Sequence, residues 1–157
     1  MSSSIRASVV DVLVVSTLPR SRAWRVLVLR RAAGQRCPGS WETVHGRVER
    51  GETPQQAALR ELREETGLTA DDVELVDQHT DWTVYEWPAD MRSSQRIGQV
   101  HRWFFFEALD DDLIPQPDGR EFSGWQWVTI DELIGRVVEF RKRPYRQVLG
   151  TMAGNGG

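Results

Sequence analysis

Apolar residues are spaced along this chain in two ways, and each spacing predicts one kind of element. Several stretches alternate apolar with polar residues, or form short apolar runs bounded by Gly, Pro and polar residues, which is typical of β-strands. Other stretches repeat apolar residues every three or four positions, as on one face of an α-helix. Strands and helices at spaced intervals predict an α/β or an α+β class. The predicted strands are residues 7–16, 24–31, 41–45, 72–87 (one long strand or a bent pair), 99–109 and 122–128.

Helix ends have their own sequence signals. Thr53 is followed by Pro54 and, three residues on, by Gln56, which is the spacing of an N-cap, a first-turn proline and a capping box. Gly67 suits the left-handed position just past a helix end. The spacing of a later Thr and Glu predicts a second helix over residues 129–140, and a short last helix follows at 143–149. The predicted loops are residues 17–23, 32–40, 88–98 and 110–120, and residues 1–6 and 151–157 are expected to be flexible.

The helix that begins at Thr53 carries three carboxylates on one face. At 3.6 residues per turn, Glu61, Glu64 and Glu65 fall within an arc of about 100°. Such residues repel one another, and a hard divalent cation such as Mg²⁺, which takes oxygen ligands, would turn that repulsion into binding. The alternative is a solvated helix face with pairs such as Arg60 with Glu64.

Composition restricts the partners of the chain. With 157 residues, one domain is expected, and the net charge of -3 predicts no binding of duplex nucleic acid. Cys37 is the only cysteine, which fits a reducing compartment. The apolar run at residues 9–15 is short and contains Asp11, so neither a secretory nor a membrane segment is predicted. These features predict a cytoplasmic protein that does not associate with membranes.

The surroundings of the three glutamates decide between the two interpretations. The stretch from residue 46 to 68 resembles the Nudix box, whose pattern is G-x5-E-x7-R-E-U-x-E-E-x-G-U, with U an aliphatic residue. A chance match at one given start has a probability on the order of 10⁻⁹. The resemblance implies an α/β/α sandwich with a mixed β-sheet, formed by a single domain over residues 1–157. The matching residues are Gly46, Glu52, Arg60, Glu61, Leu62, Glu64, Glu65, Gly67 and Leu68.

The resemblance to the Nudix family also implies a reaction. It implies Mg²⁺-dependent hydrolysis of a nucleoside diphosphate linked to some group X, with Mn²⁺ as a substitute metal. By match to the motif, Glu61, Glu64 and Glu65 bind the metal, and one of them serves as general base through water. The backbone carbonyl of His45 is a further candidate ligand, and Arg60 would orient the glutamates. Glu52 would tie the loop to the helix, and Gly46 and Gly67 are the structural glycines of the motif; for Arg60 and Glu52 a purely structural role is the alternative.

Outside the box, two regions resemble different branches of the family. Residues 99–146 are similar to the dinucleoside polyphosphate and RNA 5′-pyrophosphohydrolases, in which the glutamate that matches Glu121 completes the metal site or acts as base. An exposed loop carboxylate is the alternative for Glu121. Residues 41–52 are instead similar to the dATP and dihydroneopterin triphosphate pyrophosphatases, since Thr43-Val44-His45-Gly46 stands where the first branch has Phe-Pro before Gly-Gly. The substrate is therefore expected to be a (di)nucleoside polyphosphate or a (d)NTP-like molecule.

Candidate substrate contacts lie on the predicted strands. Gln99 and His101 belong to the stretch that faces substrate in the resembling branch, and Trp82 and Tyr85 could stack on a base. Core packing is the alternative for the aromatic residues, and a structural role for His101. The expected partner is a small nucleotide or a related diphosphate, with the 5′ end of RNA as a further candidate; edge strands permit a homodimer without requiring one. A catalytically inactive nucleotide-binding module of the same fold is the alternative to an enzyme.

Overall fold

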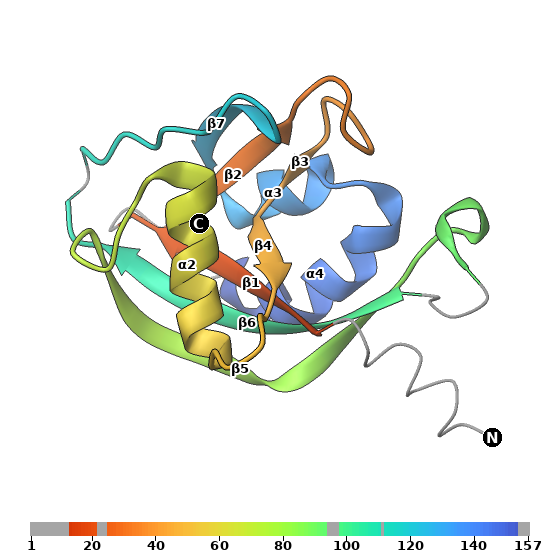
Figure 1. Ribbon diagram of the computed structural model, residues 1–157, viewed down its shortest axis with the longest axis horizontal. Coiled ribbons are helices and arrows are strands. Elements are labelled where there is room, and N and C mark those ends of the chain that lie inside the picture. Colours follow the sequence, from red (N-terminus) through yellow and green to blue (C-terminus); the bar gives the residue numbers. More distant parts are fainter. Residues whose placement is uncertain (1–12, 22–24, 94–97, 111, 154–157) are drawn as a thin grey trace.

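One mixed β-sheet runs through the part of the chain that the computed structural model describes, residues 13–21, 25–93, 98–110 and 112–153 (Figure 1). Five strands follow the order β3-β2-β1-β6-β5, while β4 pairs with β1 and β7 with β2. Within the described residues, β1 and β6 are the parallel pair and the other pairs are antiparallel. The strands are β1 (Leu13–Arg20), β2 (Val26–Arg31), β3 (Trp41–Glu42), β4 (Val44–Arg47), β5 (Val73–Glu86), β6 (Gly98–Ala108) and β7 (Phe122–Val128).

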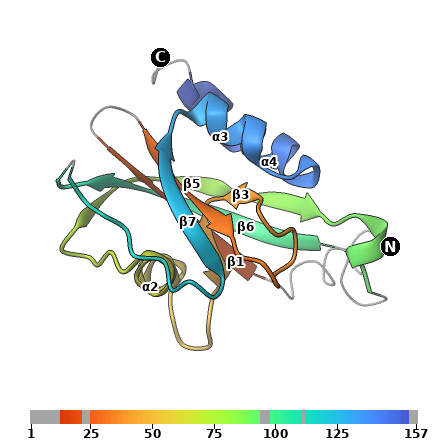
Figure 2. The same cartoon turned by 90° about the horizontal axis from the view of Figure 1, so that it is seen from above.

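Helices cover both faces of this sheet. The helix α2 (Pro54–Thr66) lies on one face, and α3 (Ile130–Arg136) and α4 (Glu139–Ala153) lie together on the other (Figure 2). The predicted α/β/α sandwich with a mixed sheet is therefore confirmed. No helix in the described residues has the length and apolar character needed to cross a lipid bilayer.

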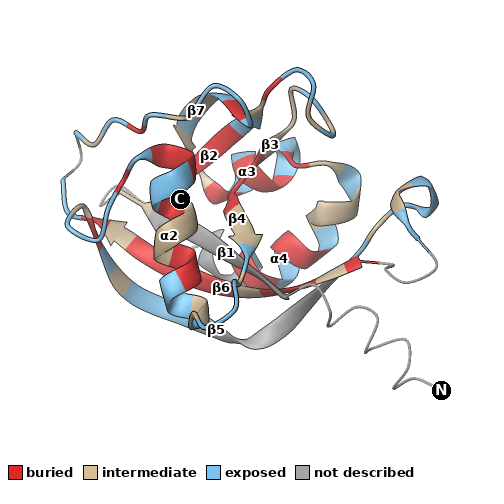
Figure 3. Ribbon diagram, viewed as in Figure 1, coloured by how far each residue is buried: buried red, intermediate tan, exposed pale blue. Residues whose placement is uncertain are grey.

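The sheet separates two hydrophobic cores, because successive side chains of a strand point to opposite faces. On β6, Trp103 and Phe105 pack with α3 and α4, whereas Phe104 and Phe106 pack with α2. The four side chains are at most 5% exposed, so β6 is buried on both faces (Figure 3). The strand holds the two helical layers at fixed positions relative to each other.

Most predicted elements are confirmed, and the differences have local causes. The strand β7 has its predicted bounds. The stretch predicted at 72–87 forms one strand, β5, over residues 73–86, with register shifts rather than a separate pair. Residues 17–20 are in β1 and not in a hairpin loop, since Pro19 and its neighbours continue the pairing with β6. Residues 89–91, predicted as loop, form the short 3₁₀ helix η1 (Ala89–Met91).

The C-terminal helices break earlier than predicted. Val137 is buried in an extended conformation that ends α3, and α4 already starts at Glu139 with Pro144 in its second turn. Residues 151–153, predicted to be frayed, belong to α4. The predicted flexible residues 1–6 and 154–157 lie outside the described residues.

Candidate active site

The helix α2 places the carboxylates, and its ends are fixed by local hydrogen bonds. The Thr53 hydroxyl accepts a hydrogen bond from the Gln56 amide at 3.2 Å, and the Gln56 side chain accepts one from the Thr53 amide at 2.9 Å. At the other end, Gly67 adopts the left-handed conformation with φ of 75°, and its N–H donates to Arg63 O at 2.8 Å. Because both ends of α2 are capped, the helix has fixed limits, and the three glutamates have fixed positions within it.

Arg60 is the centre of a hydrogen-bond network that joins the loop to the helix. Its guanidinium donates to Glu52 Oε1 at 2.8 Å, to Glu61 Oε1 at 2.7 Å and to Glu64 Oε2 at 3.1 Å. It also donates to the carbonyl of Arg47 at the end of β4, at 2.7 Å. The hydrogen bond with Glu52 is the largest cause that raises the pKa of Arg60 and lowers the pKa of Glu52. Arg60 therefore fixes the orientations of Glu61 and Glu64.

Glu65 differs from its neighbours because it is buried. The residue is 5% exposed, and its Oε2 has no hydrogen-bond partner. Burial is the largest cause that raises the pKa of Glu65 well above its ordinary value, and the nearby charges of Glu61, Glu42 and Glu121 raise it further. A hydrogen bond with the backbone of His45 acts in the opposite direction. A buried carboxylate oxygen without a partner is costly unless a cation approaches it.

Glu121 joins the cluster from a different part of the chain. It lies immediately before β7, and the residue as a whole is exposed. Partial burial of its carboxylate, followed by the charge of Asp118, raises its pKa. The pKa of Glu61 is also raised, first by burial, with contributions from Glu64 and Glu121. These couplings bring Glu121 into the electrostatic neighbourhood of the three helix carboxylates.

Gly46 determines how closely β4 approaches the helix. A Cβ atom on this residue would overlap the carboxyl group of Glu61. The chain thus needs a glycine there because a glutamate fills the space that a side chain would take.

The donor set fits a hard cation by its chemistry. All the clustered side chains offer carboxylate oxygens, and one of these oxygens is buried without a partner. In the described residues, no three Asp, Glu, His or Cys side chains are close enough around one point to enclose an ion. Arg60 accounts for part of this, since it draws Glu61 and Glu64 towards its own guanidinium. A metal would compete with Arg60 for these oxygens.

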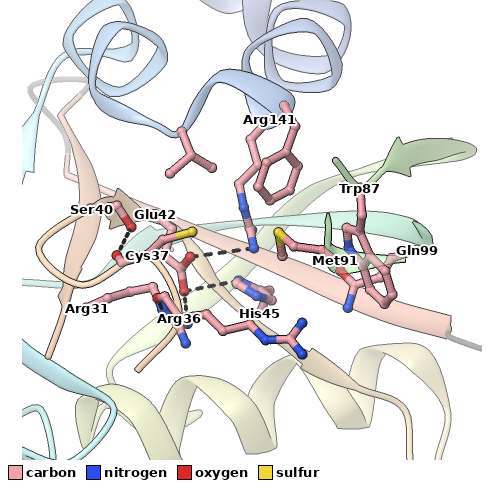
Figure 4. A pocket seen from close by; sticks show the side chains of 12 residues that line it. Arg31, Arg36, Cys37, Ser40, Glu42, His45, Trp87, Met91, Gln99 and Arg141 are labelled. Atoms are coloured by element: carbon pink, nitrogen blue, oxygen red, sulfur yellow. Dashed lines mark hydrogen bonds and ion pairs between the residues drawn. The ribbon is translucent and has the colours of Figure 1, made fainter. Parts of the chain in front are cut away.

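A pocket of about 160 Å³ opens beside the cluster, between the β3–β4 region, η1 and the start of α4 (Figure 4). The Gln99 side chain lines it, and the His101 ring lies behind, fully buried, with Nε2 2.9 Å from Gln99 Oε1. Trp82 and Tyr85 are on β5, but their side chains lie outside the described part of the structure. The lining residues are Arg31, Arg36, Cys37, Ser40, Glu42, His45, Trp87, Met91, Gln99, Val138, Phe140 and Arg141.

His45 connects the pocket to the cluster. It is in β4 opposite Ser16 of β1, next to Gly46, and its ring Nδ1 is 3.1 Å from Thr43 O. Burial is the largest cause that lowers the pKa of His45 below its ordinary value, although Glu42 opposes the shift. Burial thus favours the neutral form of the ring, and the charge of Glu42 favours the protonated form.

Sequence reasoning missed the charged wall of the pocket. Glu42 is 3% exposed and pairs with Arg31 at 2.9 Å and with Arg141 at 3.6 Å. Burial would raise the pKa of Glu42, but the opposing charges of His45, Arg141 and Arg31 lower it overall. The signal in the sequence was a glutamate inside a predicted strand, which is informative only once its partners from residues 31 and 141 are known.

Comparison with known proteins shows the family of this chain. The model of the NUDIX domain matches residues 7–148. The chain belongs to the Nudix family. The RNA pyrophosphohydrolase of Cereibacter sphaeroides is 34% identical over 148 residues, which cover 86% of this chain and 91% of that protein. Nudix hydrolase 26, chloroplastic, of Arabidopsis thaliana is 31% identical over 128 residues, 74% of this chain and 58% of that protein.

Solved structures agree on the fold. The dihydroneopterin triphosphate pyrophosphohydrolase of E. coli superposes with a TM-score of 0.71 at 20% identity, covering 88% of this chain and 95% of that one. The Ap4A hydrolase of C. elegans superposes with a TM-score of 0.66 at 19% identity, covering 91% and 98%. The family match, the complete box and the curated relatives make the chain a Nudix hydrolase, and the solved structures show the same fold.

Proposed function

We propose that this Nudix pyrophosphohydrolase is Mg²⁺-dependent and cleaves a pyrophosphate bond in a nucleoside diphosphate linked to X. The substrate class is a (di)nucleoside polyphosphate or a (d)NTP-like molecule, and Mn²⁺ substitutes for Mg²⁺. The observation that carries the proposal is the buried Oε2 of Glu65, which has no hydrogen-bond partner. Three further carboxylates lie close enough to raise the pKa of Glu65.

The proposed role of each residue follows from its position in the cluster. Glu61, Glu64 and Glu65 would hold the metal, and the backbone carbonyl of His45 would add a ligand from β4. Glu121 would complete the metal site or act as the base. Arg60 keeps the helix carboxylates oriented through its hydrogen bonds to Glu61 and Glu64. When bound, Mg²⁺ neutralises the charge that develops on the phosphoryl oxygens.

A glutamate of the cluster takes a proton from the attacking water. A general base is most effective when its pKa lies near the working pH. Burial and neighbouring carboxylates raise the pKa values of Glu61, Glu65 and Glu121 towards that range. We favour Glu121 for this role, because it is exposed to the solvent from which water enters and is held by no arginine hydrogen bond among those of the described residues.

The relatives narrow the substrates that should be tried first. The Cereibacter protein is named for RNA, which supports a 5′-triphosphorylated RNA end. The C. elegans protein is named for Ap4A, which supports a dinucleoside polyphosphate. Gln99 lines the pocket wall, which supports a contact with the part of the substrate that follows the diphosphate.

The test is a substrate screen that spans dNTPs, dinucleoside polyphosphates, ADP-ribose and 5′-triphosphorylated RNA. Release of phosphate, pyrophosphate and mononucleotide is measured with Mg²⁺, with Mn²⁺ and with a chelator. We expect turnover of at least one class with either metal and none with the chelator. Tight binding of one member without turnover of any would identify a nucleotide-binding module instead. Glu139→Gln, on an exposed side chain of α4, is a control that should keep full activity.

A further inference from the structure

Glu42 places a carboxylate in the wall of a pocket that three arginines also line. Glu42 lies at the end of β3, between Arg31 at the end of β2 and Arg141 in the first turn of α4 (Figure 4). Its Oε1 is 2.9 Å from Arg31 Nη1, and its Oε2 is 3.6 Å from Arg141 Nη2. One carboxylate thus bridges two arginines from different layers of the fold.

The three side chains are poorly screened by solvent. The exposed fractions are 3% for Glu42, 17% for Arg31 and 11% for Arg141. Two guanidinium groups and one carboxylate leave one net positive charge in this buried set. Charges in such a place interact more strongly than on an open surface. The charge of Glu42 also reaches the active-site cluster, since it contributes to the raised pKa values of Glu65 and Glu121.

We propose that Glu42 is a specificity-determining residue that limits the pocket to groups with one negative charge, such as a phosphodiester. A terminal phosphate monoester carries close to two negative charges above its second pKa of about 6. The second charge would face the carboxylate of Glu42 without a buried guanidinium to match it, because Glu42 already neutralises one of the two. The third arginine of the lining, Arg36, is exposed, so solvent screens its charge. A phosphodiester, or another part of X with one negative charge, matches the single net positive charge of Arg31, Glu42 and Arg141. This inference rests on the proposed function, since it concerns the part of a nucleotide substrate that follows the diphosphate.

The chain offers a site-specific reporter for occupancy of the pocket. Cys37 lines the pocket and is the only cysteine of the sequence, so its alkylation reports this pocket without background. The probes are adenosine 5′-monophosphate and its phosphate methyl ester, which differ by one charge at about pH 8. Protection of Cys37 by each probe, measured with a chelator, gives its dissociation constant without metal and without turnover.

In the unaltered protein, the methyl ester should protect Cys37 at the same or a lower concentration than the monophosphate. In Glu42→Gln, the concentration of monophosphate needed for protection should fall by at least about tenfold relative to that of the ester, because one buried charge has been removed. Glu42→Asp keeps the charge and should keep the original ratio. Glu74→Gln makes the same charge change on the exposed start of β5 and should also keep the ratio.

Three results would overturn the inference. They are a clear preference of the unaltered protein for the monophosphate, an equal shift for both probes in Glu42→Gln, and no protection of Cys37 by either probe. The first and third need no variant, so they decide the matter even when Glu42→Gln does not fold. A merely structural Glu42 would change stability but not the ratio of the two probes. A failed substrate screen would leave these binding results intact, so the two proposals fail separately.

Discussion

Replacing Gly46 by alanine tests the active-site geometry with a single methyl group. The backbone of Gly46 does not have a positive φ, so alanine brings no backbone strain. Its Cβ would instead overlap the Glu61 carboxyl group, which is the end of a flexible side chain. We therefore expect Glu61 to move away and the backbone to stay in place.

The two consequences of this displacement differ in size. The hydrogen bond from Arg60 to Glu61 at 2.7 Å is lost, but Arg60 keeps its bonds to Glu52 and to the carbonyl of Arg47. We expect a loss of about 1 kcal/mol in the free energy of unfolding, which lowers Tm by about 2–4 °C for a chain of this size. Displacing one electrostatic group of an active site lowers kcat by about 10²- to 10³-fold.

The assay compares kcat and Tm of Gly46→Ala with those of Gly124→Ala. Gly124 is in β7, and a Cβ there would meet no atom within 4 Å, so this control should keep both values. The double variant Gly46→Ala/Glu61→Gln should be no slower than the slower single variant, because both changes remove the same group. Near-normal kcat in Gly46→Ala, or losses that multiply in the double variant, would refute the reasoning.

Further predictions concern the other carboxylates. Glu64→Gln and Glu65→Gln should each lower kcat by at least about 10²-fold while the fold persists, as circular dichroism would report; near-normal rates in both would remove them from the metal site. The raised pKa of Glu65 means that, without metal, unfolding free energy falls as pH rises above its ordinary pKa of 4.5. The stability advantage of Glu65→Gln in urea titrations should accordingly be larger at about pH 8 than at about pH 5; an equal difference at both would contradict the burial effect. Glu121→Gln should reduce kcat more than substrate affinity, and a loss of affinity alone would make Glu121 a binding residue.

The elements that the sequence predicted well are those set by nearby residues. The ends of α2 depend on Thr53, Gln56 and Gly67, which act within a few positions of themselves, so their pattern is readable. The predictions were wrong where contacts with residues distant in the sequence decide the structure. Pro19 indicates a loop, yet the pairing of β1 with β6 continues through it. The break between α3 and α4 depends on Val137 being buried in a core that distant residues build.

The same distinction applies to the site. The helical wheel groups Glu61, Glu64 and Glu65, but it cannot tell that Glu65 faces β4 and is 5% exposed. Nothing in the local sequence connects Glu42 with Arg141, because 99 positions separate them and only the packing of α4 on the sheet brings them together. Which charged side chains pair in a folded core depends on the topology, and such pairs cannot be read from a single sequence.

The central claim is that the carboxylates of α2 hold a divalent metal. The most direct measurement is a titration of the protein with Mn²⁺, followed by electron paramagnetic resonance of the free ion, for the unaltered chain and for Glu65→Gln. We predict binding to the unaltered chain and an affinity at least about tenfold weaker in the variant, since the buried Oε2 loses its charge. Equal Mn²⁺ affinities in the two proteins would contradict the account.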